Sequence, residues 1–177
     1  MIFLYLLIAV MVLFVIVVAL QPADFRVTRS ATINAPAAVV FAQVNNFHEW
    51  EAWSPWAKID PACQNTFAGA AAGAGAKFSW AGNKKVGEGR MTILESRASE
   101  LVRIHLEFLK PFKATNTTEF LFKPEGGQTV VTWNMFGKNN FMSKAFGLFM
   151  NCDKMIGRDF EKGLANLRAV AEAAGKK

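Results

Sequence analysis

The sequence has few of the residues on which metal sites and covalent chemistry depend. Its 177 residues include two cysteines and two histidines. Cys63 and Cys152 lie far apart and lack CxxC spacing, so we expect ordinary structural roles for both, with a disulfide as the open alternative. His48 and His105 have neither a second histidine nor a carboxylate at ligand spacing. We therefore expect no metal site.

Motifs of catalysis and of cofactor binding are also missing. The sequence has no nucleophile elbow, no His–Asp pairing and no cofactor fingerprint. The small residues of Gly69–Gly75 are not followed by Lys-Ser or Lys-Thr, which favours a hairpin loop over a phosphate loop. His48, Glu49, Glu88 and Asp153 could act as acids or bases, but their spacing pairs none of them. The sequence therefore predicts no catalytic residue and no cofactor, and it leans against an enzyme.

Charge is absent from the first twenty residues. Residues 1–20 contain no charge, glycine or proline, and the phenol of Tyr5 is their one polar side-chain group. A helix of this length reaches roughly 30 Å, the thickness of the hydrocarbon core of a bilayer. A signal peptide would have a basic start and a shorter apolar core, and a buried core helix would show a polar face. We predict a transmembrane helix over 1–20, a linker over 21–24 and one domain over 25–175.

The cationic residues set the expected side of the membrane and the expected partners. All twenty lysines and arginines follow the apolar segment, with Arg26 and Arg29 soon after it. The positive-inside rule then predicts a single-pass protein with a cytoplasmic domain, and the periplasmic or extracellular side stays the alternative. The net charge of +6 fits attraction to anionic headgroups. No dense basic run is present, so no nucleic acid partner is expected.

Hydrophobic periodicity predicts an α+β domain. Residues 25–33 alternate as a strand, and two short helices follow over 37–44 and 47–53. A helix of about thirty residues is expected over 139–175. Further strands, separated by turn residues, are expected over 77–81, 86–96, 101–109, 113–123 and 129–136. The antiparallel meander has one apolar face, and the long helix is the element that can cover it.

Five segments carry motifs of one superfamily. They are Arg29–Pro36 with Val40-Phe41, Trp50–Trp56, Gly87–Met91, Thr129–Trp133 and Asp159–Leu167. Through them, residues 25–171 resemble the polyketide cyclase/dehydrase-like branch of the START/Bet v 1 superfamily, the SRPBCC proteins. The resemblance implies the helix-grip fold, a curved antiparallel sheet wrapped around a long C-terminal helix, with a deep apolar cavity between them. Members have many activities, so the fold does not set the function.

Aromatic and apolar side chains on the expected inner faces are the candidate ligand contacts. The alternative is that these rings fill the core, and Trp50, Trp53 and Trp56 are expected to form a packed corner more readily than a cavity rim. Asp153 could hold a ligand hydroxyl, pair with an arginine or lie at the edge of the helix. The candidates are Trp53, Trp56, Phe78, Trp80, Met91, Phe108, Phe120, Trp133, Met135, Phe149, Asp153 and Phe160.

Three functions remain for such a protein. The leading hypothesis is membrane-anchored binding of a hydrophobic or amphipathic small molecule, such as a lipid, in the sheet–helix cavity. The family resemblance makes a cyclase or dehydratase the first alternative, which would need Asp153, Glu88 or His48 inside the cavity. A stress-response modulator that binds another protein is the second alternative. The sequence sets neither the ligand nor the oligomeric state.

Overall fold

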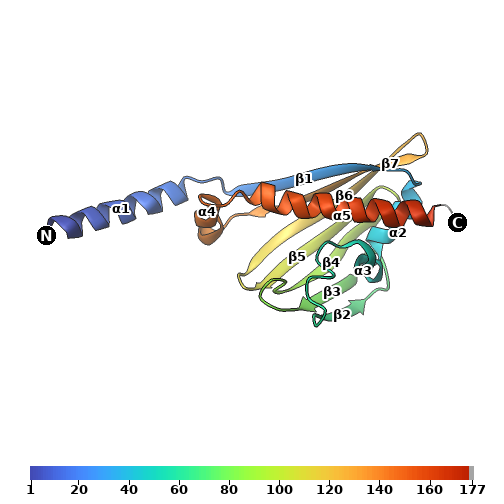
Figure 1. Cartoon of the computed structure of the whole chain (residues 1–177), viewed down its shortest axis with the longest axis horizontal. Coiled ribbons are helices and arrows are strands. Elements are labelled where there is room, and N and C mark those ends of the chain that lie inside the picture. Colours follow the sequence, from blue (N-terminus) through green and yellow to red (C-terminus); the bar gives the residue numbers. More distant parts are fainter. Residues whose placement is uncertain (176–177) are drawn as a thin grey trace.

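The chain begins with a helix that extends away from the rest of the molecule (Figure 1). The computed structural model describes residues 1–175. Helix α1, Ile2–Ala19, is long and apolar enough to cross a membrane, a property that a signal sequence shares. Its side chains are exposed apart from Val18, so it is not a core helix of the domain. A short linker then leads into the first strand.

One antiparallel sheet forms the body of the domain (Figure 1). In the described residues it has seven strands in the order β1-β7-β6-β5-β4-β3-β2, so the first strand pairs with the last. The predicted α+β class and meander are confirmed. The strands are β1 Asp24–Ile33, β2 Gln64–Gly69, β3 Ala76–Ala81, β4 Glu88–Arg97, β5 Leu101–Lys110, β6 Ala114–Glu125 and β7 Gln128–Lys138.

Strand β2 was not expected from the sequence. All its residues are exposed, so no alternation of apolar and polar side chains marks it. The Gly69–Gly75 segment forms the turn between β2 and β3, as predicted. A Cβ on Gly69 would lie 2.1 Å from the carbonyl oxygen of Gly75, and its φ is +76°, so only glycine fits there. The close backbone approach explains this part of the small-residue segment.

Three short helical segments follow β1 and close one end of the sheet. They are α2 Ala37–Asn45, the 3₁₀ turn η1 Phe47–Glu49 and α3 Trp50–Trp53. Val40 and Val44 of α2 are fully buried, and Phe41 meets the ring of Phe122 on β6 edge-on at 5.6 Å. These segments match the two predicted short helices and place most of their apolar side chains in the core.

The predicted continuous helix over 139–175 is wrong, because the chain forms two helices. They are α4 Phe141–Gly147 and α5 Cys152–Ala174. Asn140 accepts a hydrogen bond from the Ser143 amide at 2.8 Å, and Asn151 accepts one from the Lys154 amide at 2.8 Å. Each asparagine therefore starts a helix of its own, as N-cap residues do. Helix α5 lies along β1 and contacts α2 and α3.

Candidate functional site

The face of the sheet toward α5, here called the concave face, changes character along its length. Cross-strand register aligns its side chains in rows, because alternate residues of a strand share a face. At the end near α2, the far end, Ile33, Val102 and Val131 are fully buried. At the opposite end, the open end, four inward aromatic side chains are only partly buried. These are Phe25, Phe78, Trp80 and Phe108.

The open end is the end nearest α1 and α4. Strand β1 starts there at Asp24, which pairs with Lys138, and Phe25 pairs with Gly137. Asn116 on β6 also pairs with Gly137, and Phe108 at the end of β5 pairs with Ala114. The register therefore places these partly buried side chains at the end of the sheet where β1 starts, which is also the end nearest α1.

A stack of aromatic rings fills the middle of the interior. The ring planes of Trp133 and Phe160 are nearly parallel, at 7°, with centroids 4.0 Å apart. Phe120 packs 4.7 Å from Trp133, and Trp53 meets Phe120 and Trp133 at 6.0 and 5.8 Å. Exposure is at most 2% for these four side chains. Four of the candidate ligand contacts thus contact one another, so a ligand here would have to displace rings.

Helix α5 approaches this stack closely at Gly163. A Cβ at this position would lie 2.8 Å from Cζ3 of Trp133 and 3.1 Å from Cδ of Pro55. Trp56 is partly buried and meets Trp133 edge-on at 5.9 Å. Trp50 and Trp53 donate their indole N–H groups to the carbonyls of Val44 and Gln43. The structure therefore has a packed tryptophan corner, the more expected of the two predicted arrangements.

Four other candidates meet at the open end, on neighbouring strands. Trp80 lies over Gly89, where a Cβ would come within 2.4 Å of Cζ2 of Trp80. Phe78 is near-parallel to Trp80 at 6.0 Å, and Phe108 meets Trp80 edge-on at 6.0 Å. Met91 pairs with Phe78 in register and is 8% exposed. Together these side chains form an apolar wall that α5 does not seal.

Polar side chains on the concave face were missed by the sequence reasoning. Asn116 and Thr118 on β6 are 7% and 3% exposed and share a face with Phe120. A Cβ on Gly137 would lie 2.5 Å from Oδ1 of Asn116, so this glycine makes room for the amide. The indole N–H of Trp133 is buried without a partner among the described residues. Alternation along β6 could have placed both polar residues inward, since Met135 and Gly137 of β7 oppose them.

An arginine under α5 accounts for Asp153. Arg29 contacts Asp153 at 3.1 Å and Glu161 at 2.8 Å, and it also donates to the Asp153 carbonyl at 3.1 Å. Gly157 makes room, because its Cβ would overlap the guanidinium. The hydrogen bond from Arg29 lowers the pKa of the Asp153 carboxyl below its usual value. Two of the three predicted alternatives are seen: Asp153 pairs with an arginine, and it lies in the first turn of α5 with its side chain 58% exposed.

Phe149 does not lie on the inner stripe that was predicted for it. It is 78% exposed and lies between α4 and α5. The prediction extended the helical phase of Phe160 back across residues 148–151, where the helix is interrupted. Met135, in contrast, is 5% exposed on β7 and pairs with Val27 on the concave face.

The candidate acids and bases are spread around the domain. His48 stacks on Phe67 of β2, with ring centroids 3.9 Å apart. Glu88 accepts from Lys110 at 2.7 Å. His105 lies 3.7 Å from Glu107, whose pKa is lowered by a hydrogen bond from Arg90. Within residues 1–175, no three His, Cys, Asp or Glu side chains gather at metal-binding distance.

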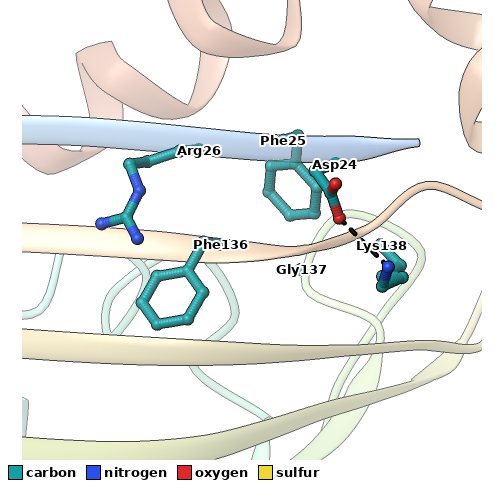
Figure 2. A pocket seen from close by; sticks show the side chains of 6 residues that line it. All are labelled: Asp24, Phe25, Arg26, Phe136, Gly137 and Lys138. Carbon is teal, nitrogen blue, oxygen red and sulfur yellow. Dashed lines mark ion pairs between the residues drawn. The ribbon is translucent and has the colours of Figure 1, made fainter. Parts of the chain in front are cut away.

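Two shallow hollows lie at the surface. One is at the end of the β1–β7 pair, where the Arg26 guanidinium lies 4.4 Å from the centroid of Phe136 and Asp24 pairs with Lys138 at 3.5 Å (Figure 2). The other lies on α5 beside Met150 and Lys154. Neither is the deep cavity that the resemblance implied, because the aromatic stack fills that part of the interior.

Comparisons with known proteins agree with this architecture. Residues 24–172 match the family described as polyketide cyclase/dehydrase and lipid transport. No curated protein matches the chain at a significant level. Protein CV1439 from Chromobacterium violaceum is 15% identical, with a TM-score of 0.60 over 86% of this chain and 99% of its own. SA2116 from Staphylococcus aureus, a protein of unknown function, is 9% identical, with a TM-score of 0.65 over 90% and 99%.

Ara h 8.0201 is 10% identical to this chain, with a TM-score of 0.55 over 85% of this chain and 97% of its own. At such identities these likenesses establish the Bet v 1-like fold and no more than the fold.

Proposed function

Since the chain belongs to the polyketide cyclase/dehydrase and lipid transport family, we propose that its concave face binds a hydrophobic or amphipathic small molecule of lipid type. The ligand lies at the open end, against Phe78, Trp80 and Phe108. The observation that carries the proposal is a contrast in burial along the concave face. Ile33, Val102 and Val131 at the far end are fully buried, whereas the aromatic side chains at the open end are only partly buried.

Exposed aromatic rings on an inner face need an occupant. Phe25, Phe78, Trp80 and Phe108 pack against the core, yet solvent reaches part of each side chain. Burial of apolar area is favourable by about 25 cal/mol per Å², so an apolar chain laid against these rings would be stabilised. Ligand sites are typically apolar with a few polar groups. This description fits the open end.

Polar groups beside the rings favour an amphipathic ligand over a hydrocarbon. Asn116 lies at the open end, and Thr118 lies one row deeper. An amide and a hydroxyl on an apolar wall can hydrogen-bond a carbonyl, carboxyl or hydroxyl of the ligand and fix its orientation. We expect the polar end of the ligand at Asn116 and its apolar part against Trp80 and Phe108.

Anchorage through α1 completes the proposal. Held at a bilayer, the domain would meet lipid ligands at a high effective concentration. The lysines and arginines that follow α1 favour the cytoplasmic side. The proposal keeps the domain bounds expected from the sequence: a membrane span over 1–20, a linker over 21–24 and a ligand-binding domain over 25–175.

Photocrosslinking tests the ligand site in the full chain. The chain is placed in nanodiscs with a diazirine-labelled fatty acid, irradiated and digested, and adducts are located by mass spectrometry. We expect adducts on peptides of β3 and β5. Phe108→Asp places a charge on the apolar wall and should reduce these adducts several-fold. Leu121→Asp is the matched control, since Leu121 is 41% exposed on the opposite face of β6.

The outcomes separate the site from its surroundings. Equal labelling of β3 and β5 in both variants and the unmodified chain would contradict a specific site on the concave face. Adducts restricted to α1 would mean that the probe only samples lipid around the span. Circular dichroism of both variants checks that the fold is retained.

A further inference from the structure

Large apolar side chains gather on and around α4 without protein cover. We call the set the α4 surface. Exposure ranges from 43% for Phe146 to 78% for Phe149. Soluble domains seldom expose so many large apolar residues together, and such patches mark contact surfaces. The members are Phe112, Phe141, Met142, Phe146, Phe149 and Met150.

The α4 surface is contiguous with the end of α1. Helix α4 packs against α1, and the Lys144 ammonium donates to the carbonyl of Ala19 at 3.2 Å. Asn139, just before α4, donates its backbone N–H to Ala23 at 2.7 Å and its side-chain amide to Pro22 at 3.3 Å. These bonds hold α4 beside the last turn of α1 and the linker (Figure 1). A bilayer spanned by α1 would end at this level.

The surface continues onto the loop between β5 and β6. Phe112 of this loop packs against Phe146 of α4, with ring centroids 5.6 Å apart. The loop directly follows β5, whose inward Phe108 belongs to the open end. The exposed apolar side chains of α4 and of this loop therefore flank the open end of the concave face.

Charge around the α4 surface fits a membrane of anionic lipid. Between residues 141 and 155 the sequence has Lys144 and Lys154 against one carboxylate, and that carboxylate, Asp153, is paired with Arg29. Lys113 adds a further cation beside Phe112. Apolar side chains bordered by lysines are typical of segments that lie in the headgroup region of a bilayer.

We infer that the α4 surface inserts into the headgroup region of the bilayer that α1 spans, with its lysines at anionic lipid phosphates. The bilayer then covers the open end, so a ligand passes from lipid to the concave face without crossing water. The inference rests on the proposed anchorage by α1, but not on the identity of the ligand.

Depth-dependent quenching in nanodiscs tests this placement. Cys152 is exposed beside the α4 surface and can carry an environment-sensitive NBD label in a Cys63→Ser chain. The matched control carries the label at Gln128→Cys, with both native cysteines replaced by serine, because Gln128 is exposed at the other end of the sheet. Nanodiscs contain phosphatidylcholine with anionic phosphatidylglycerol, with or without doxyl-labelled lipid. Alkaline carbonate extraction of liposomes first establishes that the chain is integrated.

We expect a blue-shifted, doxyl-quenched signal at Cys152 and neither effect at Gln128→Cys. Phe146→Asp together with Phe149→Asp should remove most of the quenching at Cys152, whereas Leu121→Asp should leave it intact. Omitting phosphatidylglycerol should weaken the quenching.

Three outcomes would overturn the inference. The first is an unquenched label at Cys152 in an integrated chain, which leaves the ligand site unaffected. The second is a blue shift without doxyl quenching, since a second protein copy would then cover the surface. The third is release of the chain by carbonate, which removes the anchorage on which the inference depends. Failure of the fatty-acid crosslinking alone would leave the α4 surface in place.

Discussion

The two ends of the concave face use the same residue types for opposite purposes. At the centre and far end, Trp53, Phe120, Trp133 and Phe160 fill the interior and leave at most 2% of each side chain exposed. At the open end, Phe78, Trp80 and Phe108 make similar ring contacts, including one between Phe78 and Phe47 of η1, but they stay partly exposed. Aromatic content alone therefore does not distinguish a closed core from a partly exposed wall; the cover provided by α2, α3 and α5 does.

The largest effect should come from shortening a ring in the stack. Trp133→Ala removes the side chain that contacts Trp53, Phe120 and Phe160. Such a deletion lowers the free energy of unfolding by about 3–5 kcal/mol. Phe108→Ala at the open end should cost about 1 kcal/mol, because the ring is partly exposed already. Urea unfolding of the full chain in detergent micelles measures both. Equal losses would contradict the division of the concave face into two ends.

The next effect concerns how closely α5 approaches the stack. Gly163→Val would place side-chain carbon against Trp133 and Pro55, where even a Cβ would lie at 2.8 and 3.1 Å. Overpacking of this kind costs about 1–3 kcal/mol. Gly147→Ala is the control, since a Cβ there meets no atom within 4 Å. Thermal melts measure the transition temperature of each variant. If both variants melt at the temperature of the unmodified chain, the close packing of α5 against Trp133 is contradicted.

The smallest effect is electrostatic and depends on pH. Arg29 lowers the pKa of Asp153 in the folded chain, so this carboxylate adds stability above its unfolded pKa of about 4. The contribution is lost as the pH falls through the lower folded value. The Asp153→Asn chain should therefore be slightly less stable than the unmodified chain at pH 7, and the difference should shrink below pH 4. A difference that is constant across melts from pH 7 to pH 2.5 would argue against the pairing.

Sequence periodicity predicted most of the sheet but could not predict its cover. The faces of β5 and β7 follow from alternation at Val102, Ile104, Val131 and Trp133, and burial confirms them. The break between α4 and α5 was missed because apolar residues recur across it. The predicted helix continued through Asn151. The structure shows that Asn151 caps α5 by accepting a hydrogen bond from the backbone N–H of Lys154.

The site was harder to predict for a similar reason. Asn116 and Thr118 were not among the predicted contacts, although their positions in β6 direct them inward. Arg29 lies on the face of β1 toward α5. Its partners lie more than a hundred residues later, and no spacing rule connects them. Contacts made only by tertiary packing, such as those at Gly157 and Gly163, are outside what a single sequence can indicate.

The pairing of β1 with β7 has a consequence for biosynthesis. Asp24 leaves the ribosome early, but its partner Lys138 follows more than a hundred residues later, a delay on the order of ten seconds at ordinary elongation rates. Throughout that interval a targeted α1 would already engage the insertion machinery while β1 stays an unpaired strand beside it. Closure of the sheet would then occur late, in a single step, next to the bilayer, and nascent-chain truncations before residue 138 should remain protease-sensitive.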